Sequence, residues 1–442
     1  MLEGRIDMQR TTRSAGKAIV LIVLAGLAIA APSMAATRKV LHAFTGNPDG
    51  LAPESNLIMD AHGNLYGTTY AGGTGPCEYG CGTVFELSPN STGGYTERIL
   101  HSFQGPLVDG QQPMAPLIFD AQGNLYGTTL SGGQNVTAAS GTVFKLAPNA
   151  DGTWTETVLH SFNGGLAGGT DGGEPQAGLV FDTAGNLYGT TAGGGTGSGC
   201  AGGNGCGTVF ELTPSASGGW GETILHNFTN DHRDGWSPYA KLIMDRSGNL
   251  YGTTFVGGAA GGGGTVFRLT RAGDGWEESF LYSFSCGADG CSPYSSLVFD
   301  TAGDLYGTTV GGGDKSGDGV VYKLSRNAAG DWVQTVLYAF KGASDGSYAY
   351  GNPILDASGN VYGTTLDGGG DSNTCSAGCG IVYRLAPGTG GGFTESVLAR
   401  FGNGEAGSGP LTGLLMDSSG NLYGTAAFSG PHGDGVVFEI VR

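Results

Sequence analysis

The hydrophobic residues of this chain occur in short runs that follow one another in a fixed order. One such series is PLIFD, ending at Asp120, then NLYGTT at 124–129, GTVFKL at 141–146 and TWTETVLHSF at 153–162. The runs are rich in β-branched and aromatic residues and are bounded by Gly, Asp, Asn or Ser, as β-strands are. The pattern therefore predicts four consecutive antiparallel strands, which we call A to D, in an all-β chain.

The phrase GNLYGTT, which contains strand B, occurs seven times with small changes. Its tyrosine is found at Tyr66, Tyr126, Tyr188, Tyr251, Tyr306, Tyr362 and Tyr423. A repeat of roughly 60 residues with four strands is too long for a leucine-rich or ankyrin repeat and fits one propeller blade. We predict a seven-bladed β-propeller of four-stranded blades over residues 36–442, with a β-solenoid as the alternative.

The two ends of the chain supply complementary parts of one repeat. The seventh repeat stops after strand C, VVFEIV, whereas TRKVLHAF at 37–44 aligns with strand D of the other repeats. We expect this N-terminal strand to pair with the last blade and to close the ring. Closure would remove the two open sheet edges that otherwise favour aggregation.

The repeated residues GNLYGTT, the GG that follows, GTVF and LHSF resemble the tandem repeat of the GloVer family of exported bacterial proteins. The resemblance covers essentially the whole chain after residue 35. It implies an exported, surface or extracellular repeat protein, and it assigns no biochemical role. Some relatives carry C-terminal anchors, whereas this sequence ends in GVVFEIVR, so we expect no stable membrane anchor after signal cleavage.

The N-terminal residues read as a targeting segment. Arg10, Arg13 and Lys17 precede an apolar run at 18–31 and a small-residue cleavage motif, which predicts a signal peptide over residues 1–35. We expect a secreted, extracellular or periplasmic protein. The 88 glycines have no period of three, which excludes collagen. A net charge of −18 argues against nucleic-acid and anionic-membrane partners.

All eight cysteines fall into close pairs within the loops between strands. The pairs are Cys77 with Cys81, Cys200 with Cys206, Cys286 with Cys291, and Cys375 with Cys379. In an exported chain, an even number of cysteines at short separations predicts disulfides. Zinc is the weaker alternative, because no histidine accompanies the pairs.

Several polar residues recur at fixed repeat positions. His42, His101, His160 and His226 share a strand D position with Tyr282, Tyr338 and Arg400, which favours a packing role over catalysis. Glu97, Glu156, Glu222, Glu278 and Glu395 share another strand D position and are expected to face solvent. The aspartates of the D–A crossovers are Asp49, Asp109, Asp171, Asp234, Asp289 and Asp345. We favour structural Asx-turns for them over a ring of carboxylates around the channel mouth.

Two crossovers break the repeat pattern with aromatic and polar residues. The first supplies His232, Arg233, Asp234, Trp236 and Tyr239. The second supplies Tyr348 and Tyr350. Aromatic rings beside polar groups on a rigid scaffold suit carbohydrate or peptide binding, and packing between blades is the structural alternative.

One loop resembles a calcium site. Asp314, Ser316 and Asp318 present oxygens at alternate positions before Gly319 and a strand, which suits a hard cation. The closing glutamate of an EF-hand is replaced by Ser325, so the match is partial. Calcium is the one cofactor that the sequence suggests.

The predicted function is an extracellular binding module for a glycan or protein partner. The alternative is a secreted glycan-cleaving enzyme, a hydrolase or lyase, that uses carboxylates at the propeller mouth. No HExxH, GxSxG, Walker or dinucleotide motif is present, and no catalytic residue is assigned.

Overall fold

The computed structural model describes residues 36–134, 140–164, 170–200, 205–259, 262–342, 344–370, 375, 377–402 and 404–442. The predicted signal peptide lies outside these residues. Residues 36–442 form one compact unit. In the part of the chain that the structure describes, there is no helix with the length and apolarity needed to cross a membrane.

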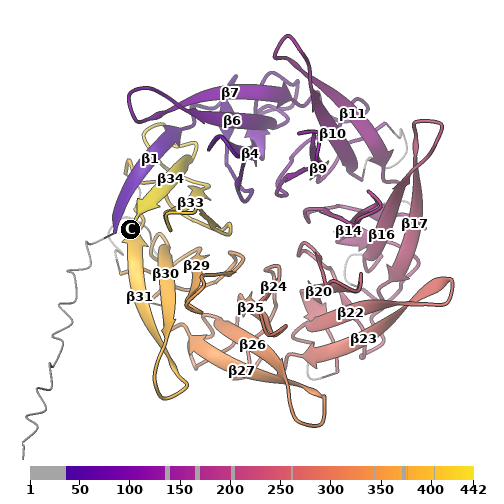
Figure 1. Ribbon diagram of the computed structural model, residues 1–442, viewed down its shortest axis with the longest axis vertical. Coiled ribbons are helices and arrows are strands. Elements are labelled where there is room, and N and C mark those ends of the chain that lie inside the picture. The colour runs from indigo at the N-terminus through magenta and orange to yellow at the C-terminus, as the bar shows by residue number, and fades with distance from the viewer. Residues whose placement is uncertain are drawn as a thin grey trace, which may run out of the picture. The chain divides into compact units, whose positions relative to one another are not determined.

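Seven four-stranded antiparallel sheets are arranged in a ring, which confirms the predicted propeller (Figure 1). The strand next to the central channel is short in every blade. These innermost strands are β3 (Ile58–Met59), β8 (Ile118–Phe119), β13 (Val180–Phe181), β19 (Ile243–Met244), β24 (Val298–Phe299), β28 (Ile354–Leu355) and β32 (Leu415–Met416). We number the blades 1 to 7 in this order.

The second strand of each blade carries the repeated LYGTT phrase and is buried along its length. These strands are β4 (Leu65–Thr69), β9 (Leu125–Thr129), β14 (Leu187–Thr191), β20 (Leu250–Thr254), β25 (Leu305–Thr309), β29 (Val361–Thr365) and β33 (Leu422–Ala426). The third strands are β6 (Thr83–Pro89), β10 (Thr142–Pro148), β16 (Thr208–Pro214), β22 (Thr265–Ala272), β26 (Val320–Arg326), β30 (Ile381–Pro387) and β34 (Val436–Val441).

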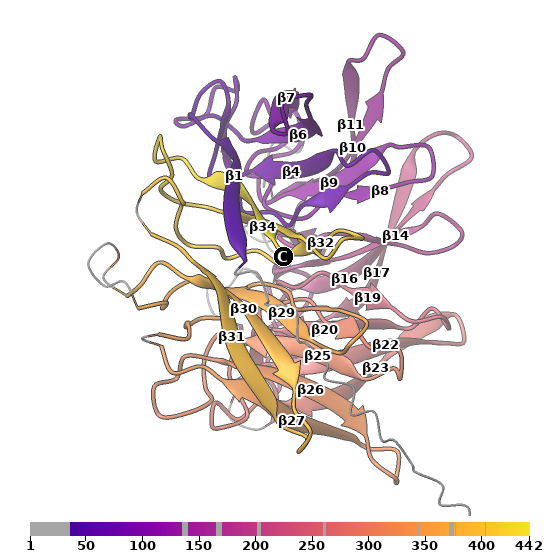
Figure 2. The ribbon, with the colours of Figure 1, turned by 60° about the vertical axis from the view of Figure 1, so that its left-hand side comes forward.

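The fourth strand of each blade lies on the outer rim (Figure 1). These outer strands are β7 (Tyr95–Ser102), β11 (Trp154–Ser161), β17 (Trp220–Asn227), β23 (Gly275–Ser283), β27 (Trp332–Ala339), β31 (Phe393–Arg400) and β1 (Thr37–Ala43). Strand β1 is the outer strand of blade 7 and pairs with β34 from Thr37↔Val441 to Ala43↔Val436 (Figure 2). The predicted closure of the ring is therefore confirmed.

The repeated phrases supply both the core within blades and the bonds between them. The glycine of LYGTT makes room for the aromatic ring of GTVF, because a Cβ at Gly189 would lie 2.5 Å from Cζ of Phe210. The first threonine of LYGTT bonds to the next blade: Thr128 Oγ1 donates to Ala177 O at 3.2 Å. The last blade bonds to the first in the same way, from Thr425 Oγ1 to Ser55 O at 3.3 Å.

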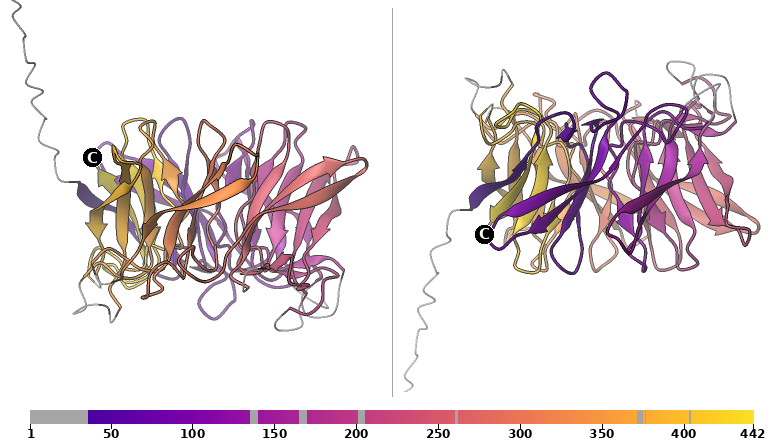
Figure 3. Two further views of the ribbon diagram at one scale, coloured as in Figure 1. Left: turned by 90° about the horizontal axis from the view of Figure 1, so that it is seen from below. Right: turned by 90° about the horizontal axis from the view of Figure 1, so that it is seen from above.

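The D–A crossovers and B–C loops share one face of the ring. The two segments pair directly as β2 (Gly50–Leu51) with β5 (Ala71–Gly72), β12 (Gly172–Gly173) with β15 (Gly193–Gly194), and β18 (Gly235–Trp236) with β21 (Val256–Gly257). Loops cover both ends of the strands in the side views (Figure 3). We call the face with these paired segments the crossover face.

Four disulfides join the predicted cysteine pairs, all in crossovers or B–C loops. They are Cys77–Cys81, Cys200–Cys206, Cys286–Cys291 and Cys375–Cys379. The expectation of disulfides is confirmed, and the zinc alternative for the cysteines is excluded because every cysteine is paired.

Candidate functional site

The residues that line the central channel come from a short frame that precedes the innermost strand of each blade. In blade 4 the frame is Pro238, Tyr239, Ala240, Lys241 and Leu242. Pro238, Ala240 and Leu242 are buried in the protein. Because side chains alternate along an extended segment, the second and fourth residues turn to the opposite side. Both of these residues line the cavity on the ring axis.

Every blade contributes the same two frame positions to this cavity. The first ring consists of Glu54, Met114, Gln176, Tyr239, Tyr294, Tyr350 and Leu411. The second ring consists of Asn56, Pro116, Gly178, Lys241, Ser296, Asn352 and Gly413. The cavity has about 70 Å³ of space for water-sized groups. Because a buried water needs roughly 10–15 Å³ by this measure, part of one sugar ring or a short side chain would fill it.

Three neighbouring blades place a tyrosine in the first ring. The ring of Tyr294 stacks on Tyr239 with centroids 5.1 Å apart and an interplanar angle of 28°. Tyr350 meets Tyr294 edge-on at 5.0 Å. Burial raises the pKa of Tyr294 and Tyr350, so both hydroxyls remain protonated at neutral pH. The three side chains form an aromatic arc on one side of the channel.

Polar groups complete the two rings. Burial raises the pKa of Glu54 to about 7 and lowers the pKa of Lys241. Within the described residues, neither side chain has a hydrogen bond or ion pair. The amides of the second ring are held between blades, since Asn352 Oδ1 accepts from Ser296 N at 2.6 Å and Asn56 Oδ1 accepts from Gly413 N at 2.8 Å. The channel therefore offers one acid, one amine and fixed amides.

The structure brings together two of the residues predicted to bind ligand. Tyr239 and Tyr350 lie in the first ring, joined through Tyr294. His232 and Arg233 are exposed and do not line the cavity. Tyr348 is 41% exposed and also lies outside the cavity lining.

The other two predicted ligand residues have structural contacts. Trp236 is half-buried and packs against the hydrophobic cluster shared by blades 3 and 4. Asp234 is buried, and its carboxylate accepts backbone N–H bonds from Thr229 at 2.8 Å and Gly235 at 2.7 Å. Both contacts favour the packing interpretation of these residues.

The sequence interpretation missed Tyr294, Glu54 and Lys241. The available signal was the frame itself: in every blade except blade 6 a proline and a leucine four residues later recur, while the second and fourth positions vary. The seven second-position residues include an acid, an amide and three tyrosines. Variable chemistry within a constant frame indicates positions that are exposed to a common space.

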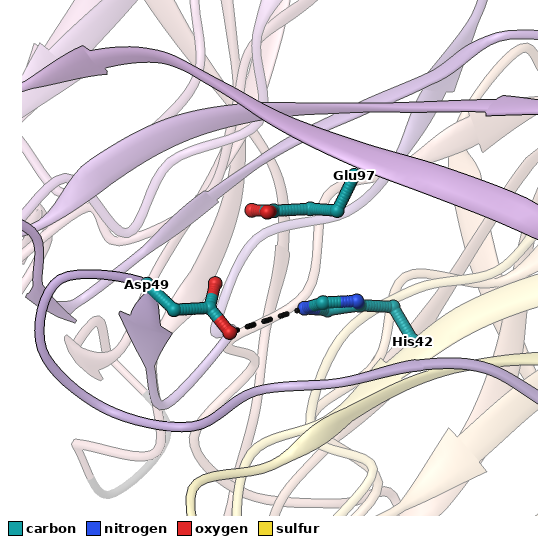
Figure 4. Close-up of side chains that lie close together, drawn as sticks. All are labelled: His42, Asp49 and Glu97. Atoms are coloured by element: carbon teal, nitrogen blue, oxygen red, sulfur yellow. Dashed lines mark hydrogen bonds and ion pairs between the residues drawn. The ribbon is translucent and has the colours of Figure 1, made fainter.

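A second group of polar clusters lies between the outer strands, away from the channel. Each cluster joins a histidine of one outer strand, the aspartate of the following crossover and a glutamate of the next outer strand. In the first, His42 Nε2 lies 3.3 Å from Asp49 Oδ2, and Glu97 points toward the same space (Figure 4). The equivalents are His101–Asp109–Glu156, His160–Asp171–Glu222 and His226–Asp234–Glu278.

The crossover aspartates form turns, as we favoured, and do not surround the channel. Asp49 accepts from Thr45 N at 3.0 Å and Gly50 N at 2.7 Å. Asp109 accepts from Gln104 N at 2.7 Å, in its own crossover. Neither aspartate lines the channel cavity. A ring of carboxylates at the mouth is therefore excluded.

The strand D glutamates do not face solvent, contrary to the sequence expectation. Glu278 is only 9% exposed, and its Oε2 lies 3.5 Å from His226 Nε2. Burial raises the pKa of Glu278 to about 8, with the nearby charge of Asp234 also raising it and His226 lowering it. Burial and Asp171 raise the pKa of Glu222 to about 9. These glutamates turn into the interface because the crossover that leads from the preceding blade packs against the outer strand.

The remaining interfaces replace the histidine. Tyr282 and Tyr338 donate from their hydroxyls to Asp289 and Asp345 at 3.1 and 2.6 Å. In blade 6 the strand register aligns Ala399 with Val382, so Ala399 and not Arg400 occupies the histidine position. The sequence alignment was therefore wrong by one residue there.

The glutamate at one interface gives a prediction about pH. The pKa of Glu278 is higher in the folded protein, about 8, than the roughly 4.3 of an unfolded glutamate. Its contribution to the free energy of unfolding is fully present below the lower value and is lost as pH rises toward 8. His226, whose pKa is also raised, contributes with the same sign. In metal-free buffer, the stability of wild type relative to Glu278→Gln should fall by on the order of 1 kcal/mol or more between pH 5 and 8.

Urea unfolding at several pH values measures this difference. Glu277→Gln, at the neighbouring exposed position, is the control and should give a flat difference. A pH-independent difference for Glu278→Gln would contradict the buried, proton-holding state of this carboxyl.

The proposed calcium ligands lie in an exposed loop. Asp314 Oδ1 accepts from Ser316 N at 2.7 Å, an Asx-turn. The backbone carbonyl of Asp318 accepts from Tyr348 N at 2.9 Å. Calcium binding by Asp314, Ser316 and Asp318 stays a prediction.

Comparisons with known proteins match the chain to a family of repeats. The profile of the Gloeobacter/Verrucomicrobia repeat matches residues 26–201 and 197–376. No curated protein matches the chain. Among solved structures, the periplasmic gluconolactonase PpgL of Pseudomonas aeruginosa has 14% identity and a TM-score of 0.49, with 85% of this chain and 96% of that chain covered.

A second solved structure is PorZ of Porphyromonas gingivalis, described as an essential bacterial surface component of the type-IX secretion system. It has 17% identity and a TM-score of 0.48, with 90% of this chain and 47% of that chain covered. At these identities, neither likeness carries information about activity.

Proposed function

Since this chain belongs to the Gloeobacter/Verrucomicrobia repeat family and folds as a closed seven-bladed propeller, we propose that it is an exported binding protein whose channel mouth takes a carbohydrate. Four intrachain disulfides support export, because disulfides persist in oxidising compartments such as the periplasm and the cell exterior. Secretion and periplasmic residence are both consistent with this chemistry.

The aromatic arc is the observation that carries the proposal. Tyr239, Tyr294 and Tyr350 come from three successive blades and occupy equivalent positions, so the rigid ring fixes their spacing. Aromatic faces pack against the C–H faces of sugar rings, and the phenolic hydroxyls supply hydrogen bonds. The arc is therefore suited to a flat ligand that is apolar on one side and polar at its edge.

The polar part of the two rings favours a hydroxyl-rich ligand over a lipid or a polyanion. The same cavity is lined by Glu54, Asn56 and Asn352. Their polar side chains can form hydrogen bonds that orient the hydroxyl groups of a ligand packed on the arc. The net charge of −18 repels polyanions at long range. A neutral glycan end fits both features.

The test is a glycan array probed with residues 36–442, followed by titration of the best ligand. Tyr294→Ala should weaken binding by about tenfold or more, because it removes the central ring of the arc. Tyr348→Ala, an exposed tyrosine outside the cavity lining, is the matched control and should leave affinity unchanged. Loss of binding in Tyr348→Ala alone would move the site to the irregular crossover and contradict the proposal.

One observation favours the alternative of a glycan-cleaving enzyme. A carboxyl whose pKa is near 7, as for Glu54, can serve as a general acid at neutral pH. However, Glu54 is the single carboxylate among the residues of the cavity lining, and glycoside hydrolysis commonly uses two. Incubating polysaccharides with the protein distinguishes the two functions. If wild type releases reducing-end or unsaturated products and Glu54→Gln does not, the protein is a glycan-cleaving enzyme and the binding proposal is wrong.

A further inference from the structure

The polar clusters between the outer strands have the composition of a transition-metal site. Each combines one imidazole with two carboxylates, and in three clusters the candidate ligand atoms lie within 4.8 Å of one another. These three are His42–Asp49–Glu97, His160–Asp171–Glu222 and His226–Asp234–Glu278. Imidazole and carboxylate are both common zinc ligands, and a set with two negative charges neutralises a divalent ion.

In two of the three clusters the distances from the histidine fit a tetrahedral ion. A zinc ion with bonds of about 2.0 to 2.1 Å holds its ligand atoms about 3.3 to 3.4 Å apart. In the blade 3–4 cluster, His226 Nε2 lies 3.2 Å from Asp234 Oδ2 and 3.5 Å from Glu278 Oε2. In the blade 2–3 cluster, the matching distances from His160 Nε2 are 3.3 and 3.6 Å.

A buried, unsatisfied oxygen provides a separate indication that a ligand is missing. The Glu278 side chain is more than nine-tenths buried and faces the histidine, yet its Oε1 has no hydrogen-bond partner. The Oε1 atoms of Glu97 and Glu222 are also buried and unpartnered, as are those of Glu156 and Glu395 outside the three clusters. Burying a carboxyl without partners is costly, and an ion in the cluster would compensate for that cost.

The interface between blades 6 and 7 differs from the others at all three positions. There the strand register places Ala399 at the histidine position and Arg38 at the glutamate position, and Ala406 replaces the crossover aspartate. Arg38 instead lies over the ring of Phe401. This interface lacks all three candidate ligands, whereas the Tyr338 interface keeps Asp345 and Glu395 and lacks only the histidine.

We propose that the three His–Asp–Glu clusters each bind one zinc ion and thereby join the outer strands of adjacent blades. This inference is independent of the channel and of its ligand. The carboxylate oxygens and the neutral imidazole coordinate the ion, and any proton held by the glutamate leaves on binding. Calcium is not a substitute, because it takes six to eight oxygen ligands and these sites offer three atoms, one of them nitrogen.

The test uses the full chain without a polyhistidine tag, stripped with EDTA, loaded with zinc and dialysed. We expect about three zinc ions per chain by elemental analysis, corresponding to the three clusters. Glu278→Gln should lower the stoichiometry by one, and Glu97→Gln, Glu222→Gln and Glu278→Gln together should abolish binding. Glu395→Gln, at the same repeat position but beside Tyr338, is the matched control and should leave it unchanged.

A second variant keeps the test independent of misfolding. His226→Tyr copies the arrangement that this chain already uses at Tyr282 and Tyr338, where the hydroxyl bonds to the crossover aspartate. The variant should fold and should lose one zinc. Zinc, but not calcium, should also raise the melting temperature of wild type. Absence of retained zinc, or the same stoichiometry in the triple variant, would overturn the proposal.

Discussion

Deleting residues 36–44 is expected to lower the free energy of unfolding by more than about 4 kcal/mol and to cause aggregation. The deletion removes β1 and exposes the edge of β34, with which β1 pairs over its whole length. It also removes Phe44, which is fully buried and packs against Phe85 of blade 1, with the two ring centroids 5.2 Å apart. Loss of a buried phenylalanine side chain alone costs about 3–5 kcal/mol. Urea unfolding and light scattering measure the two effects.

The control is the chain without residues 1–35, which should keep a single sharp unfolding transition. A synthetic peptide of residues 36–44 should restore much of the stability of the deletion variant, because its partner strand is otherwise intact. If the deletion variant unfolds at the same urea concentration as the control, strand β1 does not hold the ring closed.

Phe210→Ala should lower the free energy of unfolding by about 3–5 kcal/mol. Phe210 is fully buried and lies over Gly189. Its ring centroid is 5.1 Å from that of Phe162 in the preceding blade. The cavity left by the ring would lie between blades 2 and 3, where rigid sheets on both sides prevent collapse. Chemical denaturation followed by intrinsic fluorescence measures the loss.

Phe280→Ala provides the comparison within the same fold. This phenylalanine lies on the outer strand β23 and is 45% exposed, so its removal should cost less than about 1 kcal/mol. Equal costs at the two positions would contradict the assignment of Phe210 to the core between blades.

The fold could be predicted from the sequence because each local signal recurred seven times. The strand predicted at 124–129 is β9 (Leu125–Thr129), and the strand predicted at 141–146 is β10 (Thr142–Pro148). The innermost strand was predicted to be longer than β8 (Ile118–Phe119), because the residues before it turn to the channel and do not pair. Closure could be predicted because the two half-repeats complement each other.

The candidate site was only partly predictable, because sequence separation does not reveal the ring axis. Irregular loops drew attention to His232 and Tyr348, whereas the cavity is lined by regular frame positions. Tyr294 lies in a crossover without irregular length and was therefore overlooked. Only the closed ring shows that Glu54 and Tyr294, which are 240 residues apart in the chain, line one cavity.

Burial of the outer-strand glutamates was also hidden from the sequence. An alternating pattern places Glu278 on the outer surface of its own strand, which predicts exposure. In the assembled ring, Asp234 of the preceding crossover and His226 of the preceding outer strand β17 cover that surface. Contacts between blades are thus the part of the structure that a single repeat does not specify.

The most direct test of the channel-mouth site is a crystal structure of residues 36–442 with the best glycan from the array. We expect a sugar ring packed on Tyr294, between Tyr239 and Tyr350, with a hydroxyl within hydrogen-bonding distance of Glu54 or Asn352. Glycan density on the exposed crossover around His232 and Tyr348, with the channel filled only by water, would contradict this site.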